Sequence, residues 1–170
     1  MKAELFSSDF LISILIFFSV LSIIVFYYQN LQSDVYENNV RNDMYLKAIN
    51  VASLLATSSG YPQYWDASNV EIIGFYDNGK FNLTKFEEFK KIDYQEARKK
   101  LGTGVYNFFI SLKNTTNQII EKPGVVYSHG LSASNAEQTV LVKRLGLVNL
   151  DDKTVKVTLE VILWIWKELF

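Results

Sequence analysis

The strongest hydrophobic pattern is an uninterrupted apolar run near the start of the chain. Between Phe10 and Tyr28 there is no charged residue, and serines interrupt the run only at three positions. As a helix this run is about 28 Å long at about 1.5 Å per residue, close to the roughly 30 Å hydrocarbon core of a bilayer. The bulky residues Val25–Tyr28 are unlike a secretory cleavage site, and paired tyrosines suit a membrane interface. The run therefore predicts a retained membrane-spanning helix.

The pattern then becomes that of an amphipathic helix, with no glycine or proline between Gln29 and Ser58 to end it. Apolar residues recur at spacings of four, four, three and four, on the face formed by Val40, Met44, Ala48, Val51 and Leu55. We expect this face to pack on a sheet of the same chain. Leu31, Val35 and Ile49 fall on a different face, which indicates contacts with other subunits. Gly60, followed by Pro62, predicts the end of the helix.

Further along, the hydrophobic period changes to that of strands. Residues 139–148 and 154–166 predict a long hairpin, whose last strand becomes apolar on both faces as if a helix covered one side. Asn78-Gly79 predicts a tight hairpin turn, and shorter strands are expected at 106–112 and 125–127. A capping box at Thr84–Glu87 and the run from Asp93 to Gly102 predict two short helices.

The predicted fold class is therefore α+β, with a long N-terminal transmembrane and amphipathic helix packed on an antiparallel β-sheet.

Charge and composition exclude several classes of function. The net charge of −1 gives no electrostatic basis for binding nucleic acid. The chain has no cysteine and one histidine, His129, so thiol chemistry and histidine-rich metal sites are excluded. Tyr127-Ser128-His129-Gly130 lacks a nucleophile elbow, so we predict that His129 is a polar loop residue. We expect no enzymatic activity, no cofactor and no nucleic-acid partner.

The charges that flank the apolar run and two glycosylation tripeptides indicate on which side of the membrane each part of the chain lies. Lys2 is the only cation before the apolar run, so the positive-inside rule places the N-terminus inside the cell and the ectodomain outside. Asn82-Leu83-Thr84 and Asn114-Thr115-Thr116 match the N-glycosylation tripeptide, so Asn82 and Asn114 are candidate glycan acceptors. Tyr61, Tyr64 and Trp65 could form an adhesive patch that stacks on sugars, but packing of a helix end against a sheet is the more common use of such aromatic residues.

Several segments, taken in order, resemble archaeal type IV pilin-like proteins. Ser7-Ser8-Asp9-Phe10 is similar to the serine-any-acid-phenylalanine end of the archaeal class III signal peptide. The resemblance covers almost the whole chain and continues through "LLATSSGYPQYW", "NVEIIGFYDNGKFNLTKFEEF", "IDYQEARKKLG" and "YNFFISL". It implies four regions: a leader at 1–4, a transmembrane and filament-core helix at 5–29, its amphipathic continuation at 30–59, and a globular α+β ectodomain at 60–170.

The resemblance also implies partners and site residues. A prepilin peptidase would cut between Glu4 and Leu5, and the pilus assembly machinery would move the subunit from membrane lipid into a surface filament of pilin subunits. Asp9 would become the fifth mature residue and meet the N-terminal amine of a neighbouring subunit. The family prefers glycine or alanine before the cut and often glutamine after it, so Glu4 and Leu5 favour a minor or pilin-like component over the main subunit.

Two alternatives remain open at this stage. Asp9 could instead cap the helix at the cytoplasmic interface, where an acid is favoured by the helix dipole. The whole chain could also be a permanently anchored, single-pass membrane protein whose ectodomain is a receptor or accessory binding module.

Overall fold

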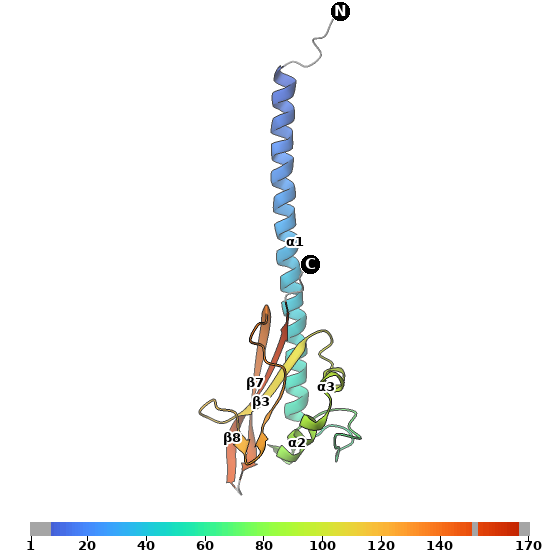
Figure 1. The fold of residues 1–170 in the computed structure, drawn as a ribbon, viewed down its shortest axis with the longest axis vertical. Helices are drawn as coiled ribbons and strands as arrows, with labels where there is room; N and C mark the ends of the chain where they lie inside the picture. Colours follow the sequence, from blue (N-terminus) through green and yellow to red (C-terminus); the bar gives the residue numbers. More distant parts are fainter. Residues whose placement is uncertain (1–7, 151–152, 167–170) are drawn as a thin grey trace, which may run out of the picture. The chain divides into compact units, whose positions relative to one another are not determined.

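The computed structural model describes residues 8–150 and 153–166, with the side chains of residues 8, 33 and 34 left aside. Internal contacts divide the chain into two units, Met1–Val40 and Arg41–Phe170. The architecture is α+β, a long N-terminal helix with a mostly antiparallel sheet, as predicted (Figure 1).

The first element is the helix α1 (Ser8–Thr57), which is continuous over 50 residues. The helix therefore continues without a break beyond the apolar run, as predicted from the absence of glycine and proline between Gln29 and Ser58. Gly60 follows the helix with a φ of +81°, which a residue with a Cβ adopts only at a cost. A Cβ at this position would also lie 2.5 Å from the carbonyl oxygen of Ile72. Gly60 therefore permits the sharp change of direction after the helix.

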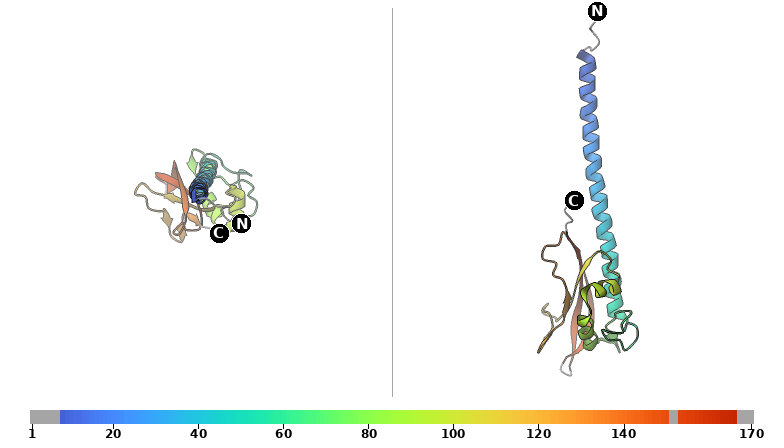
Figure 2. Two further views of the ribbon diagram at one scale, coloured as in Figure 1. Left: turned by 90° about the horizontal axis from the view of Figure 1, so that it is seen from above. Right: turned by 45° about the vertical axis from the view of Figure 1, so that its right-hand side comes forward.

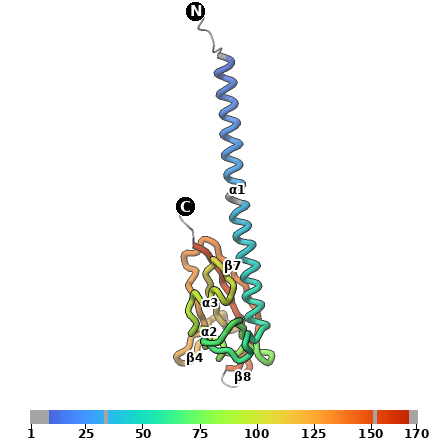
Figure 3. Tube along the Cα trace, turned by 90° about the vertical axis from the view of Figure 1, so that its right-hand side faces the viewer, coloured from blue at the N-terminus to red at the C-terminus, as the bar shows by residue number. Residues whose placement is uncertain are grey.

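The main sheet has the strand order β1-β2-β7-β8-β3-β6. Its centre is the predicted hairpin of β7 (Gln138–Leu150) and β8 (Lys153–Ile165), paired from Gln138↔Ile165 to Leu150↔Lys153. The strand β3 (Asn107–Lys113), predicted at 106–112, is antiparallel to β8, and β6 (Ser128–Gly130) is antiparallel to β3. A separate two-stranded sheet pairs β4 (Glu121–Lys122) with β5 (Val125–Val126). β4 and the start of β8 lie at the same end of this unit (Figure 3).

A tight hairpin forms at Asn78-Gly79, as predicted. It joins β1 (Tyr76–Asp77) to β2 (Lys80–Phe81), and its two turn residues have φ values of 46° and 82°. Positive φ at both positions matches the twist of the flanking strands. β2 continues the main sheet by a single parallel pair with β7, Phe81↔Val148.

Two short helices follow the hairpin, α2 (Leu83–Lys91) and α3 (Tyr94–Leu101). α3 starts and stops as predicted, with the Asp93 side chain accepting two backbone N–H groups at its start and Gly102 in the left-handed conformation at its end. The capping box predicted for α2 is wrong. The Asn82 carboxamide caps this helix, because its Oδ1 accepts from the backbone N–H groups of Thr84 and Lys85 at 3.0 and 3.4 Å.

In the unit Arg41–Phe170 the end of α1, together with α2 and α3, covers one face of the sheet (Figure 2). The predicted apolar stripe of α1 is buried at Met44, Ala48, Val51 and Leu55, and intermediate at Val40. Facing residues of β3 and β8 are equally buried, among them Phe108, Ile110, Leu112, Val157, Leu159, Val161 and Leu163. Burying one such side chain contributes about 1.5–3 kcal/mol, so this helix–sheet layer contributes substantially to the stability of the unit.

Candidate functional site

The candidate site is the apolar N-terminal part of α1. Every side chain from Asp9 to Gln32 is exposed. Within the described residues α1 is the one helix long and apolar enough to cross a membrane, and none of its most apolar 18-residue window is buried. Signal sequences and the core helices of soluble proteins can have the same length and apolar composition. A core helix, however, would be buried in its own domain. An exposed apolar surface of this length is typical of segments that lie in lipid or against other helices.

The polar groups within this segment are satisfied internally. The hydroxyls of Ser13, Ser19 and Ser22 donate to the carbonyl oxygens four residues earlier, at 2.8, 2.8 and 2.7 Å. Backbone and side-chain polar groups have no water to bind in hydrocarbon, so such internal bonds are what a lipid-facing helix needs. The outer surface of the segment is consequently apolar in spite of its three serines.

Asp9 lies in the first turn of α1 and is exposed. Among the described residues, no basic side chain lies within ion-pair distance of its carboxylate. Its backbone carbonyl accepts the Ser13 hydroxyl. This position fits both roles considered for the carboxylate, since a first-turn acid is favoured by the helix dipole and remains available to a cation from another molecule. Glu4 and Leu5, the predicted cleavage pair, lie outside the described residues.

Exposed apolar side chains continue to the end of the apolar run and beyond it. Tyr27 and Tyr28 are exposed, and Gln32 Nε2 donates to the Tyr28 hydroxyl at 2.7 Å. Leu31 and Val35, predicted for contacts with other subunits, are exposed, whereas Ile49 is half-buried. Within the second unit, Tyr45 and Leu46 are also exposed on α1. These two residues were not predicted, because they fall outside the apolar stripe whose helical spacing is visible in the sequence.

Two polar clusters hold α1 in its domain. The Tyr106 hydroxyl donates to Asp43 Oδ2 at 2.8 Å, and Lys47 Nζ lies 3.1 Å from the same oxygen. The hydrogen bond from Tyr106 has the largest effect on the pKa of Asp43. Burial raises this pKa, but the Tyr106 hydrogen bond, together with the hydrogen bond and charge of Lys47, holds it below its usual value. Arg144 on β7 donates to the Ser53 hydroxyl at 3.1 Å. These bonds connect the amphipathic part of the helix to Arg144 on β7 and to Tyr106, the residue before β3.

On the opposite face of the sheet, Glu160 is an almost fully buried carboxylate. Lys113 Nζ and Lys143 Nζ lie 2.6 and 2.7 Å from its two oxygens. Burial raises the pKa of Glu160, but the hydrogen bonds and charges of the two lysines outweigh it and leave the pKa below the usual value. Both carboxylate oxygens are occupied, so the cluster links three strands and presents no free group for catalysis.

His129 is not the polar loop residue predicted. It lies on β6, half-buried, with its ring 4.8 Å from the Phe89 ring in an edge-to-face arrangement and 5.8 Å from that of Phe108. Burial, followed by the nearby charge of Lys90, lowers its pKa. The spacing around His129 gave no strand signal because β6 is short and paired with a non-local strand. Within residues 8–150 and 153–166, no group of three or more His, Cys, Asp or Glu residues could hold a metal ion.

The aromatic residues that follow α1 differ in burial. Trp65 is buried, and its indole N–H donates to the carbonyls of Ser59 and Gly74. Tyr61 and Tyr64 remain exposed. The two candidate glycan acceptors also differ, because Asn82 caps α2 whereas Asn114 begins a loop whose next four residues are exposed.

No family model, curated protein or solved structure matches the chain. The fold, with its exposed apolar helix and covered sheet, is compatible with the pilin-like architecture that the sequence resembles.

Proposed function

We propose that this chain is a structural subunit, minor or pilin-like, of an archaeal type IV pilus-like surface filament. The observation that carries the proposal is that one continuous helix begins with a fully exposed apolar segment and ends as the packed cover of a sheet. Such a chain has two environments to satisfy. Its ectodomain is stable against its own helix, while its apolar segment needs lipid before assembly and neighbouring helices afterwards.

Transfer of the apolar segment from lipid to a helix bundle is physically reasonable. Lipid tails are as apolar as leucine side chains, so helices associate in membranes through packing and polar contacts rather than through the hydrophobic effect. A carboxylate costs about 2.5–3.5 kcal/mol at the bilayer centre on insertion scales and less near its edge. A cationic N-terminal amine of a neighbouring subunit would offset that cost at Asp9. Leader removal by a prepilin peptidase would create this amine at Leu5.

The N-terminus of the native protein tests this mechanism. Mass spectrometry of the chain purified from cell-surface filaments should find a first residue of Leu5. A chain that retains Met1 or Lys2 in those filaments would contradict processing between Glu4 and Leu5.

The alternative function is a permanently anchored, single-pass receptor or accessory binding module, with its ectodomain outside the cell. Glu4 and Leu5 favour it, because they depart from the residues that the resembled family has around the cleavage site. This alternative predicts an uncleaved, monomeric protein that is found in the membrane fraction and not in sheared surface filaments.

A further inference from the structure

We propose that Asn114, and not Asn82, carries an N-linked oligosaccharide. The two sequons are equivalent as tripeptides, so only their structural settings can distinguish them. The inference depends on one part of the proposed function, the external orientation of the ectodomain, because the transferase that recognises these tripeptides works on exported chains.

Asn82 is tied into the fold by both ends of its carboxamide. Its Oδ1 caps α2, and its Nδ2 donates to Asp77 Oδ2 at 3.3 Å. The backbone N–H of Asn82 donates to the Phe75 carbonyl at 2.7 Å, and the middle residue of the sequon, Leu83, is buried. A transferase that had to extend this tripeptide would therefore break the helix cap and expose core residues.

Asn114 lies in a loop that is closed by its own residues. Its Oδ1 accepts from the Thr116 N–H at 3.0 Å, the Thr116 hydroxyl at 2.7 Å and the Gln118 N–H at 3.0 Å. No acceptor in the described part of the chain binds Asn114 Nδ2. Residues 115–118 are exposed, so this loop can open without disturbing the core.

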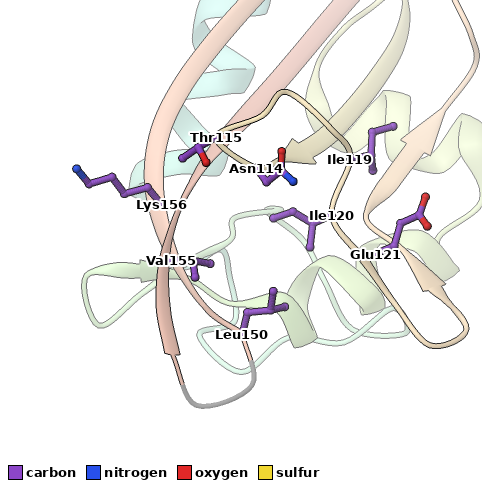
Figure 4. Close-up of a pocket in the computed structure, with 8 residues that line it drawn as sticks. All are labelled: Asn114, Thr115, Ile119, Ile120, Glu121, Leu150, Val155 and Lys156. Carbon is purple, nitrogen blue, oxygen red and sulfur yellow. The ribbon is translucent and has the colours of Figure 1, made fainter.

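The surroundings of Asn114 also leave space for a sugar. β3 ends at Lys113, paired with Thr158, while β8 extends back to Lys153 without β3 beside it. Beside Asn114, where β3 has ended, lies an open hollow of about 480 Å³. Its apolar lining residues include Ile120, Leu150 and Val155 (Figure 4). Thr115 and Glu121 bring polar side chains to the lining of the same hollow, whereas the Lys156 ammonium points away from it (Figure 4). Apolar surface for sugar C–H groups beside polar groups for hydroxyls suits the first residues of a glycan.

The modification is a group transfer that needs a lipid-phosphate-linked oligosaccharide as donor. Nδ2 of Asn114 forms a bond to C1 of the first sugar, and the bond between C1 and the phosphate oxygen of the donor breaks. The lipid phosphate leaves with the bonding electron pair, and one Nδ2 proton passes to a base of the transferase. No group is oxidised or reduced.

The experiment is site-specific mass spectrometry of the full chain, purified from its native cells as wild type and as four variants. Wild type should carry glycan on the peptide with Asn114 and none on the peptide with Asn82. Asn114→Gln and Thr116→Ala should each reduce the intact mass by the whole glycan. Thr116→Ser, which keeps the acceptor tripeptide, and Asn82→Gln should retain the glycan.

Each other outcome overturns the inference in a recognisable way. Glycan on Asn82, alone or together with Asn114, contradicts the distinction drawn from the fold. Glycan on neither residue contradicts the assignment of Asn114 if external protease digests the ectodomain of intact cells. If the ectodomain is protected from that protease and carries no glycan, the external orientation in the proposed function fails as well.

Discussion

At the scale of single residues, Glu160 shows how strongly one polar group can depend on its neighbours. It is buried, and both of its oxygens are bound by lysines from adjacent strands. Glu160→Gln removes two charge-assisted hydrogen bonds, so we expect the free energy of unfolding to fall by about 1.5–3 kcal/mol. Urea denaturation of the full chain in detergent micelles, followed by tryptophan fluorescence, measures this change. Glu137→Gln, at an exposed position, is the matched control and should leave stability nearly unchanged.

Wild type and Glu160→Gln should also differ in how their free energy of unfolding depends on pH. The folded-state pKa of Glu160 lies below the ordinary glutamate value of 4.5. Its stabilising contribution is therefore complete above that value and is lost as the pH falls through the folded-state pKa. The stability difference between wild type and Glu160→Gln should shrink in acid. A difference that is the same in acid as at neutral pH would contradict the role assigned to the carboxylate.

Asn82 marks the limit of prediction at this scale. Thr84-Lys85-Phe86-Glu87 has the residue types of a capping box, yet the helix begins two residues earlier. Asn and Thr are both good caps, and the choice between them is decided by the hydrogen bonds that connect Asn82 to Phe75 and Asp77. Those contacts depend on how the preceding hairpin folds, so no local pattern contains them. For the same reason the sequence alone treats Asn82 and Asn114 as equal sequons.

At the scale of elements, the amphipathic part of α1 should contribute much of the stability of the unit Arg41–Phe170. Leu55 on the buried stripe is fully covered, whereas Leu46 on the same helix is 61 % exposed. Leu55→Ala should lower the free energy of unfolding by about 2–5 kcal/mol, because it removes buried methyl groups and leaves a cavity. Leu46→Ala should change it by at most about 0.5 kcal/mol. Equal effects of the two substitutions in the denaturation assay would contradict the packing of α1 on the sheet.

The elements themselves were predictable where the signal is local. The unbroken helix, the Asn78-Gly79 turn, the hairpin of β7 and β8, and the stop at Gly102 all follow from periodicity or from residues with a restricted conformation. β6 and the parallel pair of β2 with β7 were not predicted, because both are short and gain their hydrogen bonds from strands distant in sequence. The exposed Tyr45 and Leu46 were also missed, since exposure depends on which faces the sheet leaves uncovered.

At the scale of the whole molecule, Asp9 distinguishes assembly from simple membrane anchoring. Asp9→Asn keeps a side chain that can cap a helix but removes its charge. We expect this variant to reach the membrane in normal amounts and to be lost from sheared surface filaments, because in the proposed assembly the amine of the neighbouring subunit would have no anionic partner. Asp9→Glu, which keeps the charge, should assemble at least in part. Normal filaments of Asp9→Asn would leave the carboxylate as a helix cap only.

The central claim is that the apolar part of α1 is surrounded by other subunits in the final assembly. A photo-crosslinking phenylalanine analogue at Phe17, an exposed position in the middle of the apolar run, tests this claim directly. In sheared surface filaments, irradiation should join the chain to further pilin subunits, and crosslinks from the same analogue at exposed Thr115 should be far fewer. If irradiation at Phe17 gives lipid adducts alone and the chain stays monomeric in the membrane, the filament account is contradicted.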